Sequence, residues 1–396
     1  MSYEFIPRRQ IQERGVRRVR YVRSLDKIAT IPAEEREALK AVTNHYVFRA
    51  NDYYLGLIDW SDPNDPIRRL IIPQIEELND WGALDASNEQ LVTVARGVQH
   101  KYDHTVLLLC NEVCGGYCRY CFRKRLFMDN NEEVANDVSK GLAYIADNPS
   151  VTNVLLTGGD PLLMSTRRIV DILDALRLIP HVRIIRIGSK IPAFNPWRII
   201  DDPQLQDAFL RFSTPTRRIY LMAHFDHPRE LTEHAVGAID CALRSRLICV
   251  NQCPLIRGIN DDPTVLAELF QQLSWIGCPP YYLFQGRPTV GNEPFAVPIV
   301  RGWKIFQEAL RRGSGLARRA RFVMSHATGK VEIMAVDDSN IFLRYHRAKD
   351  PADRGRFMVY KRNDDAFWLD QLEPADESDA PKFSQSSRLA VDEGPE

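Results

Sequence analysis

The chain has 396 residues, 44% of them hydrophobic, and is long enough for one large domain with appendages or for two domains. Its 52 basic and 52 acidic residues give a formal net charge of zero, which argues against a nucleic-acid-binding surface. No apolar run approaches the roughly 18 residues of a membrane span, and the arginine-rich start has no apolar signal segment, so we expect a cytoplasmic protein.

Residues 1–100 are predicted to form an N-terminal arm followed by a helical module. The arm is rich in arginine and lacks apolar periodicity up to residue 25. From Pro32 the pattern is that of short amphipathic helices, interrupted by turn residues between Asp59 and Pro66. No catalytic constellation is visible in this part of the chain.

Residues 105–125 combine an apolar run with a cluster of cysteines. Cys114, Cys118 and Cys121 have the spacing C-x3-C-x2-C, and three thiolates this close can converge on one inorganic centre but cannot easily pair as disulfides. A structural zinc site normally has four ligands, whereas three cysteines on a cubane cluster leave one iron open. The spacing resembles that of the radical S-adenosylmethionine (SAM) enzymes, although alone it also fits a zinc knuckle or a loop of unrelated thiols.

Six short apolar runs alternate with helical patterns in the middle of the chain. The runs lie at residues 105–111, 151–159, 182–189, 218–225, 246–256 and 279–285. Alternating strands and helices predict a parallel sheet, and six units are too few to close an eight-stranded barrel. The fold class expected for residues 101–300 is therefore α/β, a partial (β/α)6 barrel.

In such a fold the site residues gather where the parallel strands end. The polar or glycine-containing ends of the runs include Gly158, Gly159, Asp160, Ser189 and Gln252. Glycine lets backbone approach a ligand closely, so we expect the amides of the TGGDP stretch to meet the carboxylate or amino group of SAM.

The end of the chain is predicted to add a small extension and a tail. Residues 301–372 are expected to form a C-terminal α+β extension, because residues 331–336, 341–347 and 354–362 show strand-like alternation. Residues 373–396 are polar and acidic, with little to bury, and are expected to be disordered.

Several segments in combination resemble the lysine 2,3-aminomutase family of radical SAM enzymes. They are YYLGLIDWSDPNDPIRRLIIP, CGGYCRYCFRKR, LLTGGDPLL, IRIGSKIPAFNPWRI, HFDHPREL, NQCPLIRGIND and PYYLF, and the similarity covers about residues 25–335. The resemblance implies a [4Fe-4S] cluster on the three cysteines, SAM on its open iron, and pyridoxal 5'-phosphate (PLP) on a lysine after the barrel. It assigns PLP to Lys330 in SHATGKVEI and the substrate carboxylate to Arg123. Tyr120 stands where the lysine enzymes have a histidine, and its ring can pack against a cofactor.

The activity that the resemblance implies is an isomerase that moves an amino group between the alpha and beta carbons of an amino acid. In the lysine enzymes two aspartates hold the distal ammonium group of the substrate. Here Arg287 stands at the first position, and an apolar residue, Val323 or Met324, at the second. A cationic side chain would meet like charge, so free lysine is disfavoured and an acidic substrate such as glutamate is favoured.

The expected partners are a small-molecule amino acid and an electron donor such as flavodoxin or ferredoxin, and by analogy the chain forms a homo-oligomer. Two alternatives stay open from the residues alone. One is a radical SAM enzyme that consumes SAM and lacks PLP. The other is a non-catalytic iron-sulfur or zinc protein.

Overall fold

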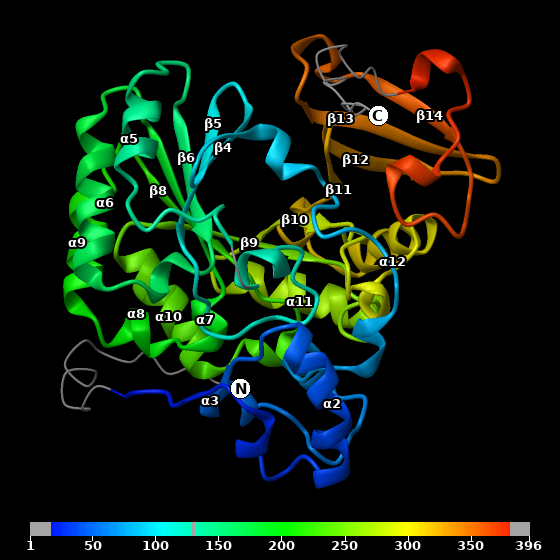
Figure 1. Ribbon diagram of the computed structural model, residues 1–396. Helices are drawn as coiled ribbons and strands as arrows, with labels where there is room; N and C mark the ends of the chain where they lie inside the picture. The colour runs from blue at the N-terminus through cyan, green and yellow to red at the C-terminus, as the bar shows by residue number, and fades with distance from the viewer. Residues whose placement is uncertain (1–16, 129–130, 381–396) are drawn as a thin grey trace, which may run out of the picture.

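The computed structural model describes residues 17–128 and 131–380 of the chain. A twelve-stranded sheet runs through them in the order β3 to β14, which is also the order of the strands along the chain (Figure 1). Its middle strands are parallel: β5 (Thr105–Asn111), β6 (Asn153–Gly158), β7 (Ile184–Ser189), β8 (Ile219–Ala223), β9 (Ile248–Pro254), β10 (Pro280–Phe284) and β11 (Arg321–His326). Because β3 and β14 lie at opposite ends of this order, the barrel is open, as predicted.

The six predicted strands are confirmed as β5 to β10, and β11 adds a seventh parallel strand that was not predicted. Its sequence offers a short apolar stretch, Phe322 to Met324, directly after an arginine-rich turn. Such a stretch does not stand out from its neighbours, and β11 forms because β10 supplies a parallel edge for it.

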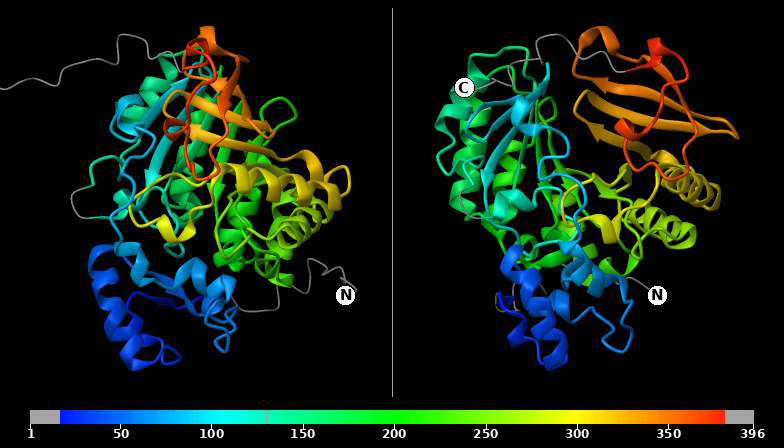
Figure 2. Two further views of the ribbon diagram at one scale, coloured as in Figure 1. Left: turned by 90° about the vertical axis from the view of Figure 1, so that its right-hand side faces the viewer. Right: turned by 45° about the vertical axis from the view of Figure 1, so that its right-hand side comes forward.

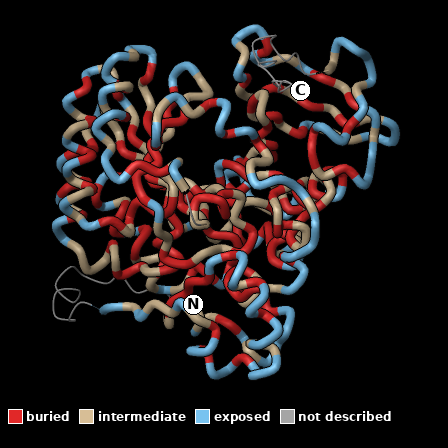
Figure 3. The backbone as a smooth tube through the Cα atoms, viewed as in Figure 1, coloured by how far each residue is buried: buried red, intermediate tan, exposed pale blue. Residues whose placement is uncertain are grey.

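Helices lie along the outer face of the sheet and connect its strands (Figures 1 and 2). They are α5 (Ser139–Ala146), α6 (Thr166–Leu178), α7 (Ile191–Phe194), α8 (Trp197–Ile200), α9 (Pro203–Phe212), α10 (Glu233–Arg244), α11 (Pro263–Trp275) and α12 (Ile299–Arg312). Ser165, Asp202, Thr232 and Asp262 cap the N-termini of α6, α9, α10 and α11 through side-chain oxygens. Buried residues concentrate between the sheet and these helices (Figure 3), so a rigid core positions the loops at the strand ends.

The N-terminal module is not purely helical. It contains α2 (Ala33–His45), α3 (Asp52–Leu55) and α4 (Pro66–Ile71), together with an antiparallel pair, β1 (Tyr21–Val22) and β2 (Ala50–Asn51). A second hairpin, β3 (Thr93–Ala95) and β4 (Val98–Tyr102), joins the main sheet beside β5. Gly97 makes that turn possible with a φ of +76°.

The C-terminal extension continues the main sheet with antiparallel strands β12 (Gly329–Val336), β13 (Asn340–Ala348) and β14 (Phe357–Lys361). The expectation of disorder is wrong for residues 373–380, which bond to β14 and include the 3-10 turn Glu377–Asp379. The rest of the predicted tail, residues 381–396, and the start of the predicted arm, residues 1–16, lie outside the described residues. The division of the chain into domains stays a prediction. Within the described ranges, no helix is both long and apolar enough to span a bilayer.

Candidate active site

A cavity of about 340 Å³ lies where the parallel strands end. Lys330 of β12 and Arg347 of β13 also line it. With the exception of Val323 and Met324, the residues that the sequence analysis proposed for the site line this cavity: Cys114, Cys118, Tyr120, Cys121, Arg123, Gly158, Gly159, Asp160, Ser189, Gln252, Arg287 and Lys330. The topology therefore gathers residues that are up to 216 positions apart (330 minus 114).

The three cysteines lie on the loop after β5, which is tied to the N-terminal module. The Tyr117 amide donates to the Arg49 carbonyl oxygen (2.9 Å), and the Arg119 amide donates to the Leu70 carbonyl oxygen (3.0 Å). Burial raises the pKa of the Cys118 thiol to about 12. The thiol therefore keeps its proton at neutral pH until a metal displaces it.

The placement of these cysteines is compatible with a cluster. Among residues 17–128 and 131–380, no three histidine, cysteine, aspartate or glutamate side chains are grouped as ligands of one ion would be. In a [4Fe-4S] cube each cysteine binds a different iron, so the thiols must surround a larger space. Cys114, Cys118 and Cys121 line one cavity, an arrangement that fits the cube.

The TGGDP stretch after β6 packs against the cysteine loop. Gly158 has a φ of +110°, and a Cβ on Gly159 would lie 2.6 Å from the Val113 carbonyl oxygen, so both positions require glycine. The expectation of free amides is wrong for Gly159, whose amide donates to the Asn111 carbonyl oxygen (2.5 Å). The close approach of two backbones takes up this donor and fixes the cysteine loop against β6.

Asp160 and Ser189 are bonded to each other at the cavity wall. The Ser189 hydroxyl donates to the Asp160 carboxylate (2.8 Å), which also accepts from the Lys190 amide (2.8 Å). Burial raises the pKa of the Asp160 carboxyl to about 6. The pair joins the end of β6 to the end of β7, and Gln252 lines the same cavity from β9.

A buried polar network holds Tyr120. Its hydroxyl donates to Asp226 (2.5 Å) and lies 3.0 Å from Nε2 of His224. Asp226 also accepts from Lys190 (2.7 Å), whose ammonium lies 2.6 Å from Glu230. Burial alone would raise the pKa of the Asp226 carboxyl, but His224 and Lys190 outweigh it and lower that pKa. The sequence analysis did not identify this network, which fixes the tyrosine ring against the cavity.

Arg123 and Arg287 meet at a carboxylate that the sequence analysis missed. Glu89 accepts from Nη1 of Arg287 (3.1 Å) and Nε of Arg123 (3.3 Å). Burial alone would raise the pKa of the Glu89 carboxyl, but the guanidinium groups around it hold that pKa well below its usual value. Glu89 begins the 3-10 turn Glu89–Val92, so residues 1–100, in which no catalytic constellation is visible from the sequence, also line the cavity.

Lys330 is the second residue of β12, opposite Arg347 of β13. Its Nζ lies 4.7 Å from the centre of the Phe284 ring. Burial lowers the pKa of the Lys330 amine well below its usual value, and the positive charges of Lys101 and Arg287 lower it further. A lowered pKa makes the unprotonated amine, which is the nucleophilic form, easier to reach.

Cations that the sequence analysis missed surround Lys330. Lys101, Arg186 and Arg347 line the cavity, and Nη2 of Arg347 donates to the Thr105 hydroxyl (3.0 Å). Arg186 was visible in the sequence as a charge inside an apolar strand run. The sequence around Lys101 and Arg347 gives no such indication. They belong to β4 and β13, which are brought together only by folding. Together these cations can hold a dianion.

We expect sulfate, a dianion throughout this range, to bind more weakly as the pH rises above neutrality. Burial lowers the pKa of the Lys101 ammonium to about 7. Above that pH the anion must draw a proton onto Lys101, so its affinity should fall by up to about tenfold per pH unit. Calorimetric titration at pH 6 to 9 measures this slope. K101M should flatten this slope, and the control K304M, which removes an exposed lysine on α12, should keep it. An unchanged slope in K101M would contradict the assignment.

The two apolar residues expected at the second specificity position do not line the cavity. Val323 and Met324 are fully buried (0% exposed), and the residue of β11 that lines the cavity is Ser325, opposite Lys330. The cavity lies at the carboxyl end of the strand, which the earlier residues do not reach. The position therefore offers a small hydroxyl group.

Comparisons with known proteins give the following relatives. The chain is 53% identical over 355 residues to a protein of Aquifex aeolicus provisionally named L-lysine 2,3-aminomutase, covering 89% of this chain and 95% of that one. It is 35% identical to the L-lysine 2,3-aminomutase of Clostridium subterminale (75% and 71% covered). It is 31% identical to the glutamate 2,3-aminomutase of Clostridioides difficile (76% and 70% covered).

No family model matches the chain. The solved structure of a radical SAM methyltransferase from Sphaerobacter thermophilus matches with a TM-score of 0.39 and 17% identity over 57% of this chain and 68% of that one.

Proposed function

Because the chain belongs to the lysine 2,3-aminomutase family of radical SAM enzymes, we propose that it is a PLP-dependent isomerase of a free amino acid with an acidic side chain. The enzyme would move the amino group between the alpha and beta carbons. The observation that carries the proposal is one cavity that brings together three cysteine thiols, a lysine of lowered pKa and two paired arginines.

The family uses a [4Fe-4S] cluster, SAM and PLP. When bound, the cluster and SAM supply a carbon-centred radical able to remove hydrogen from an unactivated carbon, and PLP supplies a conjugated ring for the migrating nitrogen. Cys114, Cys118 and Cys121 would hold the cluster. Gln252 and the walls built by Gly158 and Ser189 would hold SAM beside it. A homo-oligomeric state stays a prediction.

The opposite part of the cavity fits PLP. The Lys330 amine is available for covalent attachment, and Arg347 lies across the strand pair from it. Arg347, Lys101 and Arg186 provide the positive charge that a phosphate group requires. The cations serve two purposes, since they would bind the phosphate and they lower the pKa of the Lys330 amine.

Arg123 would bind the alpha carboxylate of the substrate. It donates from Nη1 to the Thr157 hydroxyl (2.9 Å) and from Nε to Glu89 (3.3 Å), which fixes the plane of its guanidinium group. A fixed fork can bind a carboxylate through two parallel bonds. The substrate would then be oriented with its reacting carbon toward the cluster end of the cavity.

The charges of the cavity favour a second anionic group on the substrate. In the part of the cavity with Lys330 and Arg287 the lining cations are Lys101, Arg123, Arg186, Arg287 and Arg347, and they outnumber the one lining carboxylate, Glu89. A phosphate group takes about two of them and an alpha carboxylate takes one. The remaining charge suits a side-chain carboxylate near Arg287, although Glu89 already shares that guanidinium group.

The test is an anaerobic incubation of the reconstituted enzyme with SAM, PLP, a reductant and single amino acids, followed by mass spectrometry. We expect a beta-amino acid from glutamate or aspartate, without matching accumulation of deoxyadenosine. Deoxyadenosine that accumulates without any isomer would refute the aminomutase for free amino acids and favour the SAM-consuming alternative.

Charge reversal near Arg287 should redirect the substrate preference. In the double variant R287D/S325D two carboxylates would replace a guanidinium and a hydroxyl group, so lysine should gain over glutamate by about 100-fold in relative kcat/KM. Competition between the two amino acids measures the ratio. The control R321D changes a charge at the other end of β11 and should leave the ratio unchanged. If R287D/S325D still preferred glutamate, Arg287 would not determine the substrate specificity.

A further inference from the structure

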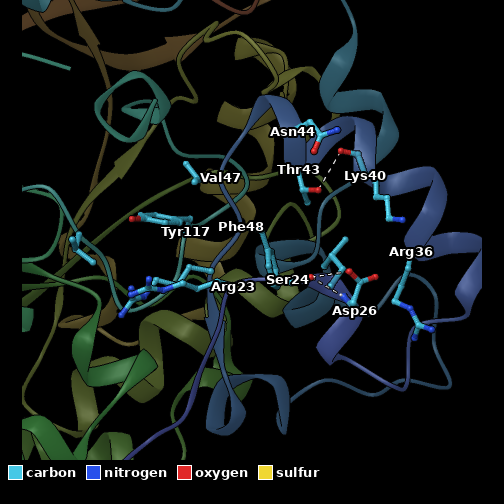
Figure 4. Close-up of a pocket in the computed structure, with 13 residues that line it drawn as sticks. Arg23, Ser24, Asp26, Arg36, Lys40, Thr43, Asn44, Val47, Phe48 and Tyr117 are labelled. Atoms are coloured by element: carbon cyan, nitrogen blue, oxygen red, sulfur yellow. Dashed lines mark hydrogen bonds between the residues drawn. The ribbon is translucent and has the colours of Figure 1, made fainter. Parts of the chain in front are cut away.

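A second cavity lies on the N-terminal module, outside the active site. Its volume is about 570 Å³, and Figure 4 shows that its walls come from the segment around Arg23 to Asp26, from helix α2 and from the segment around Phe48. We call it the basic cleft, because Arg23, Arg36, Lys40 and Arg49 line it together with one acidic residue, Asp26.

The cysteine loop forms one wall of the basic cleft. Val113 and Tyr117 line the cleft, whereas their chain neighbours Cys114 and Cys118 line the active-site cavity. The Tyr117 amide donates to the carbonyl oxygen of Arg49, another residue of the cleft wall (2.9 Å). A single stretch of chain therefore separates the cleft from the thiols that would hold the cluster.

The positive charge of the cleft is only partly compensated. Arg36 donates to the carbonyl oxygens of Ile28 (3.2 Å) and Ile31 (2.6 Å), which are neutral. Arg49 is buried over the Tyr21 ring at 4.1 Å, and its Nε has no hydrogen-bond partner in the described structure. Lys40 pairs with Glu37 at the exposed edge, where solvent screens the pair.

Further arginines precede the cleft along the chain. Arg17, Arg18, Arg20 and Arg23 are all exposed, and the Arg17 guanidinium lies 4.3 Å from the centre of the Trp197 ring. Arg20 pairs with Asp52 on the surface. The chain as a whole has no net charge, so the basic surface is local to this module. A local basic surface over a buried redox centre attracts an acidic partner and orients it.

We propose that the basic cleft is the docking site of the electron donor, an acidic one-electron carrier protein of low potential. This rests on the proposed function, which requires a reduced cluster. The donor gives one electron to the oxidised cluster, which becomes [4Fe-4S]+, and the donor is oxidised by one electron. Val113 and Tyr117 separate the docked carrier from the cluster, and the exposed Arg23 and Lys40 hold its acidic face.

The test compares two reductants on the reconstituted enzyme. Reduced flavodoxin is the protein donor, and photoreduced deazaflavin is a small reductant that needs no docking. Stopped-flow absorbance follows cluster reduction, and calorimetry measures flavodoxin binding at low ionic strength. We expect R23E/K40E to slow flavodoxin-driven reduction at least about tenfold and to weaken binding, because like charges now face each other. Reduction by deazaflavin should be unchanged.

The matched control is K140E/R167E, which reverses two exposed charges on α5 and α6. It should behave as the unaltered enzyme does with both reductants. Flavodoxin-driven reduction that is equally fast in R23E/K40E would overturn the proposal, and so would an equal slowing with both reductants. A failure of the proposed function would be seen separately, because the unaltered enzyme reduced with deazaflavin would then form no beta-amino acid. The rate of cluster reduction by flavodoxin would still test the docking site.

Discussion

Replacing Lys330 with alanine should abolish covalent binding of PLP and lower aminomutase activity by about 10³-fold or more, the scale expected for loss of a group that takes part in the chemistry. The reason lies in the surroundings of the amine. Burial and nearby cations lower the pKa of the amine, and the cross-strand position of Arg347 supplies charge for a phosphate group. Borohydride reduction followed by peptide mapping locates the attached cofactor.

A suitable control is K349A, which removes an exposed lysine close to the same hairpin. It should keep the visible absorbance of bound PLP and normal activity. If borohydride still fixed PLP to the K330A variant at another lysine, Lys330 would not be the attachment site. If K330A lost the cofactor but kept its turnover, the reaction would not depend on PLP.

The fold was largely predictable because buried parallel strands have a simple sequence pattern. β5 to β10 appear as continuous apolar runs, and the chemistry-bearing residues follow them directly. β11 was not predictable in the same way, since its apolar part is short and its partner β10 decides its conformation. The hairpin β3–β4 depends likewise on the free edge of β5.

The site was predictable only where a residue stands next to a recognisable strand end. Cys114, Gly158 and Ser189 have such positions. Glu89 does not: its role depends on Arg123 and Arg287, which are 34 and 198 positions away in the chain. A buried ion network is a property of the folded chain, so local pattern gives no indication of it.

Substituting Glu77 by glutamine should have the largest effect on stability. Glu77 and Arg119 are 0% and 2% exposed in their side chains. Glu77 accepts from Nε (2.9 Å) and Nη2 (2.8 Å) of Arg119 and from Lys124 (3.2 Å). A neutral glutamine would leave two buried cations without a counter-ion, which costs about 3–5 kcal/mol. Urea unfolding of the apoprotein measures this loss.

The position of Arg119 makes the same substitution a test of cluster assembly. Arg119 directly follows Cys118, and its Nη1 donates to the Val47 carbonyl oxygen (3.1 Å), so Glu77 anchors the cysteine loop to the N-terminal module. E77Q should therefore also lower the iron and sulfide content after reconstitution. The neighbouring exposed residue Glu76 provides the control, because E76Q should change the unfolding free energy by less than about 0.5 kcal/mol. If E77Q were as stable as E76Q, water or another carboxylate would compensate the charge of Arg119. If E77Q were destabilised but kept its full iron content, cluster assembly would not depend on the stability of the N-terminal module.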